Sequence, residues 1–400
     1  MADIQLAKRI AKIQPSATLA LTAKAKSLAA QGHDVIALTA GEPDFWTPES
    51  IRSVAIDALK NDKSACRYTA AAGMPELREA IANKFKRDNG LEYSTAQTIA
   101  SCGAKHSLFN ALAALVDDGD EVILTAPYWV SYPEMVSFLG GKSVIIDTSN
   151  TGFVLTAEAL KAAITDKTKV LVLNTPGNPS GAVWSAEQQK ALADVLEGTG
   201  IAVVSDEIYE KLIYGGKHVS FASLSEDAYN RTITVNGVAK AYAMTGWRIG
   251  FAAGPLHVIK AMSSLQSHST SNPATVSQIG TVKALSEGPP ELVGWLAKFE
   301  QRRGIIVDGL NAIEGIECAI PGGAFYVFPD FRALIGKRLG ERVLDSDAVF
   351  CDALLNDMYV AGVPGSAFGS PGFVRLSYAA SEESLREALK RIAEFCGKLV

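Results

Sequence analysis

The chain has 400 residues, of which 48% are hydrophobic and 20% are charged, and its formal net charge is −5. This length suits two domains, or one large domain with an appendage, and the composition is ordinary for a soluble globular protein. The negative charge gives no electrostatic footprint for nucleic acid, and the longest apolar runs are too short to cross a membrane. We therefore expect neither nucleic acid nor a membrane as a partner.

The N-terminal residues and the cysteines indicate the compartment. Residues 1–16 interleave basic and apolar residues and lack the unbroken apolar core of a signal peptide, so they favour a surface helix. The five cysteines are odd in number and scattered, without paired metal-ligand spacing. We expect no disulfide framework, no metal site and a cytoplasmic location.

Short runs of apolar and β-branched residues alternate with segments of helical spacing through the N-terminal part of the chain. The runs are at 35–40, 121–125, 143–146, 169–173, 201–205 and 231–235, and helices are expected at 104–115 and 186–196. Strands that are buried on both faces read as continuous apolar runs. The alternation therefore favours an α/β fold with a mostly parallel sheet and helices on both faces.

The pattern changes near residue 291. A long charged helical stretch at 295–313 precedes weaker strand patterns at 318–320, 325–328 and 374–378 and a final helix at 382–396. These elements indicate a second, smaller α+β domain that a continuous helix connects to the first. We expect a large domain at 51–292 and a small domain at 293–400, with residues 1–50 contributing to the small domain and the substrate mouth.

In open α/β sheets, ligands bind beyond the carboxyl ends of the strands, so the residues at those ends are informative. Asp206 follows the run 201–205, where its carboxylate could face a cleft or simply cap a helix. The run 169–173 leads into Asn-Thr-Pro-Gly-Asn-Pro-Ser-Gly, which indicates a loop of defined turns and does not by itself prove a function. Residues 101–105 precede an apolar helix and form either an anion seat or an ordinary capped helix.

A lysine follows the run 231–235. A lone lysine after a strand is usually solvated, but Lys240 lies among small residues that leave room for a bulky cofactor. Apolar surroundings and a nearby cation would lower its pKa and suit it to act as an amine nucleophile and proton shuttle. Arg248, eight residues later, could bind a phosphate with both arms of its guanidinium.

These motifs together resemble those of class I (fold type I) aminotransferases, which use pyridoxal phosphate (PLP). The stretch 237–250 resembles the family's lysine-attachment motif, and Gly-Glu-Pro-Asp-Phe at 41–45 resembles its N-terminal glycine loop. Similar matches are Asn-Pro-Ser-Gly at 178–181, Ser-Asp-Glu-Ile-Tyr at 205–209 and the arginine segment at 374–378. Pro-Ser-Ala-Thr at 15–18 and Pro-Tyr-Trp-Val-Ser-Tyr-Pro at 127–133 are most similar to the bacterial aspartate aminotransferase subgroup Ib.

The resemblance implies a fold type I transferase and a role for each matching residue. Lys240 would hold PLP as a Schiff base and carry the proton between substrate and cofactor, and Asp206 would keep the pyridine nitrogen protonated. The other implied cofactor contacts are Tyr209 and Asn178 at the phenolic oxygen, Trp129 on the ring, Gly103, Ala104 and Arg248 at the phosphate beside Lys105, and Tyr68 from a partner subunit. Arg375 would bind the substrate α-carboxylate, with help from Asn178 and the Gly41 backbone. The active site would therefore lie at the interface of a homodimer.

The implied reaction is a ping-pong transfer of an amino group from an L-amino acid to a 2-oxo acid. Lys105 stands where subgroup Ib carries a lysine thought to meet the distal carboxylate, which favours aspartate as donor and 2-oxoglutarate as acceptor. Lys105 could instead be a solvated lysine at a helix start. Gln14 replaces the basic residue of relatives that accept prephenate, and Trp46 replaces a small or acidic residue. Aspartate is therefore favoured, an aromatic amino acid stays an alternative substrate, and the absence of the basic residue makes prephenate a less favoured one.

Other reaction and protein classes also stay open at this point. A PLP-dependent β-lyase or decarboxylase would use the same lysine on the same fold. A ligand-sensing domain of a transcription regulator would need an attached DNA-binding domain, and residues 1–40 show no basic helix-turn-helix pattern. A nicotinamide dehydrogenase shares the α/β rhythm, but its glycine fingerprint is missing.

Overall fold

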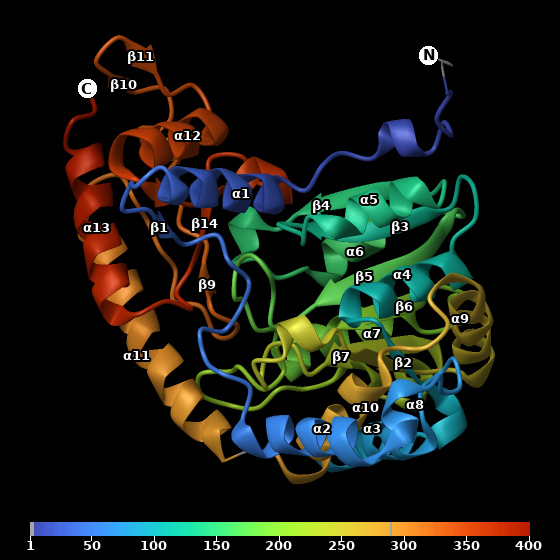
Figure 1. Ribbon diagram of the computed structural model, residues 1–400. Coiled ribbons are helices and arrows are strands. Elements are labelled where there is room, and N and C mark those ends of the chain that lie inside the picture. Colours follow the sequence, from blue (N-terminus) through green and yellow to red (C-terminus); the bar gives the residue numbers. More distant parts are fainter. Residues whose placement is uncertain (1–3, 289) are drawn as a thin grey trace.

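The computed structural model describes residues 4–288 and 290–400 (Figure 1). Its main feature is a seven-stranded sheet in the order β2-β8-β7-β6-β5-β3-β4. The strands are β2 (Thr98–Ser101), β3 (Glu121–Ala126), β4 (Lys142–Asp147), β5 (Thr168–Asn174), β6 (Ala202–Asp206), β7 (Thr232–Gly237) and β8 (Gly250–Ala253). Neighbouring strands pair in parallel, except that β8 is antiparallel to both of its neighbours. The prediction of a mostly parallel sheet is confirmed.

Successive residues of the central strands face opposite sides of the sheet and are buried on both. Val170 and Val172 of β5 pack into one hydrophobic cluster with α4 (Ala104–Leu115) and α9 (Leu256–Ser269). Leu171 and Leu173 pack into another with α6 (Ala157–Ala163) and α7 (Ala186–Leu196). Helices on both faces thus explain why this strand reads as an unbroken apolar run.

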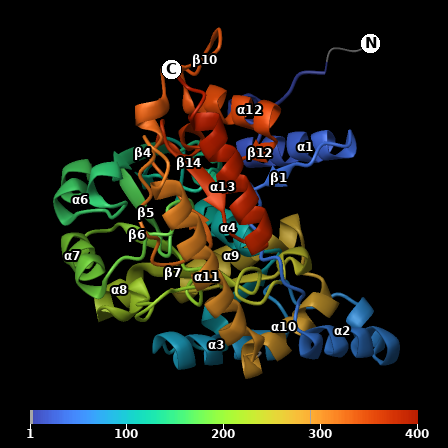
Figure 2. The ribbon, with the colours of Figure 1, turned by 90° about the vertical axis from the view of Figure 1, so that its left-hand side faces the viewer.

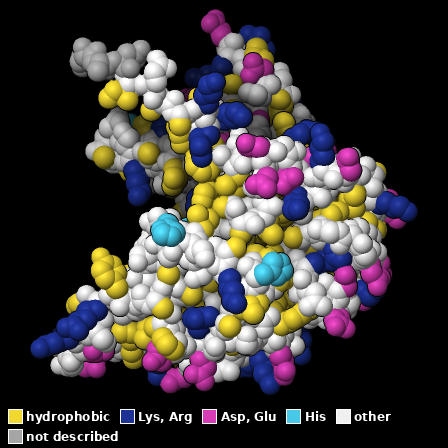
Figure 3. Space-filling model, turned by 90° about the vertical axis from the view of Figure 1, so that its right-hand side faces the viewer, with side chains coloured by type: hydrophobic (Ala, Val, Ile, Leu, Met, Phe, Trp, Pro, Cys, Tyr) yellow, Lys and Arg dark blue, Asp and Glu magenta, His cyan; other side chains and the backbone are white. Residues whose placement is uncertain are grey.

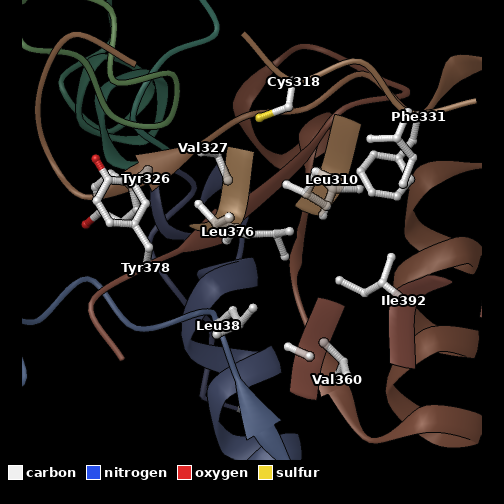
Figure 4. Close-up of a cluster of buried hydrophobic side chains, with 14 of the residues drawn as sticks. Leu38, Leu310, Cys318, Tyr326, Val327, Phe331, Val360, Leu376, Tyr378 and Ile392 are labelled. Atoms are coloured by element: carbon white, nitrogen blue, oxygen red, sulfur yellow. The ribbon is translucent and has the colours of Figure 1, made fainter. Parts of the chain in front are cut away.

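The C-terminal part forms a smaller layer of helices on a three-stranded sheet. The sheet has the order β13-β14-β9, with β9 at Tyr326–Val327, β13 at Val363–Pro364 and β14 at Val374–Ser377. The helices are α11 (Glu291–Asn311), α12 (Asp347–Met358) and α13 (Glu382–Cys396). Figure 2 shows α11 and α13 side by side, and Figure 4 shows the buried side chains between these helices and the sheet, among them Leu310, Leu376 and Ile392.

The remaining elements complete the two layers. The helices are α1 (Ala17–Ala30), α2 (Glu49–Asn61), α3 (Pro75–Asn89), α5 (Ser131–Phe138), α8 (Glu226–Arg231) and α10 (Thr275–Glu287), and the strands are β1 (Ile36–Ala37), β10 (Arg338–Leu339), β11 (Arg342–Val343) and β12 (Val360–Ala361). In residues 4–288 and 290–400, no helix combines the length and the apolar character that crossing a membrane requires.

The expected strand at 35–40 does not belong to the central sheet. Only Ile36–Ala37 forms a strand, β1, and it pairs in parallel with β12 of the smaller layer. The backbone of Leu38 continues the contact, because its N–H donates to Ala361 O and its carbonyl accepts from Ser377 N. The apolar run showed that this segment is buried but not which sheet it would join.

Two other expected elements are wrong. No strand forms at 318–320, because the side chain of Asn311 hydrogen-bonds both the N–H and the carbonyl of Cys318, at 2.8 and 2.9 Å, in place of a neighbouring strand. The surface helix expected at 1–16 is only a 3-10 turn at Ile10–Lys12 among the described residues 4–16. The first α-helix begins at Ala17, where the side chain of Ser16 caps it.

Candidate active site

The carboxyl ends of three neighbouring strands bring the predicted site residues to one edge of the sheet. Asn174 at the end of β5 is in register with Asp206 at the end of β6, and Asp206 is in register with Val235 of β7. Lys240 follows shortly after β7 ends at Gly237. This placement follows from the parallel pairing of β5, β6 and β7.

The amine of Lys240 is held between charged and aromatic groups. Its Nζ donates a hydrogen bond to the carbonyl of Gly41 at 2.5 Å and lies 5.8 Å from the ring centre of Tyr209. Burial lowers the pKa of Lys240 to about 8, and the charges of Arg375 and Arg248 act in the same direction against Glu42 and Asp206. More of the amine is therefore unprotonated near neutral pH than in an ordinary lysine, as a nucleophile and proton carrier requires.

The carboxylate of Asp206 is buried and accepts two hydrogen bonds. The hydroxyl of Tyr132 donates to Oδ2 at 2.7 Å, and the backbone N–H of Ile208 donates to Oδ1 at 3.2 Å. Burial raises the pKa of Asp206 to about 6, while these hydrogen bonds and the charge of Lys240 oppose that rise. Asp206 can therefore be ionised at neutral pH and pair with a protonated ring nitrogen.

The anion seat considered at residues 101–105 would lie at the start of α4. Gly103 caps this helix with a φ of +89°, and a Cβ there would lie 2.5 Å from Nη2 of Arg248. The guanidinium thus lies against the helix terminus, whose first N–H groups have no partners within the helix. Ala104 passes β8 so closely that a Cβ on Gly250 would lie 2.0 Å from its backbone nitrogen. Helix N–H groups beside a guanidinium suit a phosphate dianion.

Arg375 is a buried cation whose hydrogen-bond partners are uncharged. Its guanidinium donates to Oδ1 of Asn178 at 3.0 Å and to the carbonyl of Thr39 at 2.7 Å, and it lies 4.6 Å from the ring centre of Tyr326. Burial lowers its pKa, and its Nε has no hydrogen-bond partner among the described residues. A buried guanidinium with an unsatisfied donor suits the binding of a carboxylate.

Aromatic side chains lie close to Asp206 and Lys105. Trp129 and Tyr132 meet edge to face with ring centres 5.4 Å apart, and Nζ of Lys105 lies 4.7 Å from the ring centre of Trp129. Trp129, Tyr132 and Asn178 line the same cavity. Burial and the charge of Arg248 lower the pKa of Lys105, which places this lysine near the anion seat.

The sequence did not identify several residues that touch the site. Tyr132 contacts Asp206, Tyr326 shares a 2.9 Å hydrogen bond with Tyr209, and the Thr39 carbonyl accepts from Arg375. Tyr132 lies within the aromatic segment 127–133, and this segment was the available signal. Of the predicted residues, Tyr68 alone stands apart, with 91% of its surface exposed.

Comparison with known proteins identifies the family. Residues 33–392 match the family model described as aminotransferase class I and II. The chain belongs to the class I PLP-dependent aminotransferases of the bacterial aspartate aminotransferase type. The fold type I architecture and an enzyme of the transferase type are thereby confirmed, and the nicotinamide dehydrogenase alternative is wrong.

Relatives and solved structures cover nearly the whole chain. Aspartate aminotransferase of Geobacillus stearothermophilus is 50% identical over 395 residues, which span 98% of this chain and 99% of that protein. Probable aspartate/prephenate aminotransferase of Rhizobium leguminosarum bv. phaseoli is 48% identical over 98% of both chains. The crystal structure of the Rhizobium meliloti aspartate aminotransferase superposes with a TM-score of 0.95 at 46% identity, over 99% of this chain and 100% of that one. The Thermus thermophilus aspartate aminotransferase with maleate gives 0.92 at 46% identity, over 98% and 100%.

Proposed function

We propose that this aminotransferase binds PLP at the sheet edge and transfers the amino group of L-aspartate to 2-oxoglutarate. One observation supports this most strongly: the amine of Lys240 has a lowered pKa, and two guanidinium groups contribute to it. Arg248 lies at the start of α4, and Arg375 has an Nε without a hydrogen-bond partner among the described residues. A cofactor with a phosphate and a substrate with a carboxylate fit this arrangement.

The residues at the site match each part of PLP. The N–H groups of Ala104 and Lys105 at the start of α4, next to Gly103, and the guanidinium of Arg248 would hold the phosphate, and Asp206 would face the ring nitrogen. Asn178 and Tyr209 would hydrogen-bond the phenolic oxygen, with Trp129 against the ring face. When bound, PLP supplies an electron sink for the negative charge that develops at the substrate Cα.

The chain's own groups bind the substrate and move its proton. Lys240 takes the Cα proton at Nζ, and the Gly41 carbonyl, 2.5 Å from Nζ, fixes where that atom lies. Arg375 and Asn178 orient the α-carboxylate, which places the Cα–H bond toward Lys240.

The proposed donor is aspartate because a second cation lies beside the ring. Lys105 is exposed, its Nζ lies over the ring of Trp129, and it has no carboxylate partner among the described ion pairs, so it can bind a distal carboxylate. A structure of the Thermus thermophilus relative was solved with maleate, a dicarboxylate. Two positions that could alter the substrate mouth lie outside these contacts: the N–H of Gln14 donates to Glu134, and Trp46 is 81% exposed beside Arg52.

We also propose how the chain is organised and where it works. Residues 51–292 would form the large domain and 293–400 the small one, with 1–50 joining the small domain through β1. The exposed Tyr68 would reach the phosphate of a second copy in a homodimer, and Figure 3 shows a hollowed face with hydrophobic side chains gathered in it, which suits such an interface. Within the described chain the five cysteines are free, in keeping with a cytoplasmic enzyme.

The cofactor proposal is tested by the visible spectrum of the purified protein with PLP. We expect a yellow protein whose visible absorption disappears in Lys240→Ala and persists in Lys190→Ala, an exposed lysine of α7 paired with Asp194. A colourless native protein that PLP cannot reconstitute would overturn the proposal.

The reaction is tested with aspartate and 2-oxoglutarate. We expect glutamate to form in step with loss of aspartate. Alanine or ammonia without glutamate would show a β-lyase or decarboxylase instead. Faster turnover of phenylalanine than of aspartate would contradict the proposed donor, and faster amino transfer to prephenate, a 2-oxo acid, than to 2-oxoglutarate would contradict the proposed acceptor.

A further inference from the structure

Tyr132 lies against Asp206, and the function proposed above gives it no role. Its hydroxyl donates to Oδ2 of Asp206 at 2.7 Å, and both side chains are buried. We propose that Tyr132 is a positioning residue that keeps Asp206 ionised and aimed at the ring nitrogen of the cofactor. This inference rests on the proposed PLP site.

The two hydrogen bonds to Asp206 fix the plane of its carboxylate. Tyr132 donates to one oxygen, and the backbone N–H of Ile208 donates to the other at 3.2 Å. The backbone donor persists in any variant at position 208 except proline. Tyr132 is therefore the side chain whose hydrogen bond fixes the orientation of the carboxylate. A phenol that donates to a carboxylate stabilises the ionised form over the neutral one.

The charges around Asp206 make this donor important. Tyr132 donates to the carboxylate, and the charges of Lys240 and Glu207 act on its pKa, while Asp206 in turn raises the pKa of Tyr209. Burial and Glu207 raise the pKa of Asp206, and the hydrogen bond from Tyr132 is the largest influence that opposes burial. The pKa of Tyr132 itself is raised well above its ordinary value by burial and by Asp206, so its hydroxyl stays a donor at every working pH. Without that hydroxyl, Asp206 would be protonated nearer neutral pH and could not pair with a protonated ring nitrogen.

The ring of Tyr132 has a separate packing role that its hydroxyl does not share. The ring meets Trp129 edge to face at 5.4 Å, and the backbone N–H of Tyr132 donates to the Trp129 carbonyl at 3.0 Å. Phenylalanine would keep both contacts and lose only the hydrogen bond to Asp206. Tyr132→Phe therefore separates the positioning role from packing.

The experiment compares two cofactors on the apoenzyme of the full chain. PLP has a ring nitrogen, whereas 1-deaza-PLP carries a CH group there and has the same phosphate and aldehyde. The ratio of their dissociation constants therefore reports the contact with Asp206 alone. At about pH 6 we expect this preference for PLP to fall roughly ten-fold in Tyr132→Phe, because a hydrogen bond to a charged group is worth that factor or more. We expect the variant and the native enzyme to converge by about pH 9, where Asp206 is ionised in both.

Two further variants make the result decisive. Tyr229→Phe loses a 2.7 Å hydrogen bond to the carbonyl of Glu92, outside the site, and should keep the native preference. In an Asp206→Asn background, Tyr132→Phe should leave the ratio unchanged. Equal weakening of both cofactors by Tyr132→Phe, with an unchanged ratio, would overturn this inference and leave the PLP site standing. A native apoenzyme that binds neither cofactor would overturn both.

Discussion

The guanidinium of Arg375 donates a hydrogen bond to the side-chain oxygen of Asn178 at 3.0 Å, although the two residues are 197 positions apart in the chain. Arg375 belongs to β14 of the smaller layer, and Asn178 follows β5 of the large sheet. The carboxylate-binding part of the site therefore exists only where the two layers meet. Because Asn178 is neutral, the positive charge of Arg375 stays available to a substrate.

Replacing Arg375 tests this contact directly. Arg375→Lys keeps the charge but loses the planar pair of donors, so we expect kcat/KM for aspartate to fall by about two to three orders of magnitude. The visible absorption of the bound cofactor should be unchanged. Arg332→Lys, at an exposed arginine paired with Asp330, is the matched control and should behave as the native enzyme. An unchanged kcat/KM in Arg375→Lys would rule out the assigned role.

The close approach of Gly103 to Arg248 predicts a defect in cofactor binding. In Gly103→Ala, the new Cβ would lie 2.5 Å from the guanidinium at a φ of +89°, so Arg248 must move from the anion seat. We expect the dissociation constant for PLP to rise roughly ten-fold or more. Gly90→Ala also has a positive φ, +68°, but nothing within 4 Å of its Cβ. That control should lose about 1 kcal/mol of stability and bind PLP normally.

The lowered pKa of Lys240 predicts a pH profile for cofactor attachment. The amine attacks only when unprotonated, so the rate at which apoenzyme takes up PLP should rise with pH and level off near a pKa of about 8. An ordinary lysine would still be gaining reactivity at about pH 10. The carboxylate of Glu42 raises the pKa of Lys240, so Glu42→Gln should move the break to lower pH. Stopped-flow absorbance measures both profiles, and a break that moves upward in Glu42→Gln would contradict the assignment.

The ion pair between Asp44 and Arg302 predicts a coupling between the glycine loop and α11. The two guanidinium nitrogens Nη1 and Nη2 of Arg302 donate to Asp44 at 2.7 and 2.8 Å, and Arg302 is buried. Asp44→Asn and Arg302→Gln should each cost about 1–3 kcal/mol, and the double variant should cost less than their sum. Thermal unfolding of the native protein, the two single variants and the double variant measures this coupling. The exposed pair Lys190–Asp194 is the comparison and should have little effect, and strict additivity for Asp44 and Arg302 would show no coupling.

The position of Lys105 predicts that its replacement selectively lowers activity toward an acidic substrate. Lys105→Gln keeps the length and polarity of the side chain but removes its charge. We expect kcat/KM for aspartate to fall about 10- to 100-fold while that for phenylalanine changes little, because only aspartate carries a distal carboxylate. An equal loss for both substrates would assign Lys105 to the cofactor and not to the substrate.

Local sequence signals predicted a good part of the fold. The predicted helix at 186–196 is α7, whose start carries a capping box of Ser185 and Gln188, and Ser381 caps α13 at its predicted start. Pairing partners were not predictable in the same way. β8 lies antiparallel between β2 and β7, and β1 pairs with β12. An apolar run in the sequence shows that a strand is buried but does not show which strand lies next to it.

The sequence by itself determined which residues can carry the chemistry. Asp206 and Lys240 were identified because each follows an apolar run, and strand ends are local features of the chain. Only the tertiary structure decided which side chains hydrogen-bond those residues and so set their orientation and protonation. Tyr132 and Asp206 are 74 positions apart, and their hydrogen bond exists because α5, which packs against β3 and β4, brings Tyr132 to the end of β6. Contacts of this kind depend on how elements pack and leave no trace in the spacing of residues along the chain.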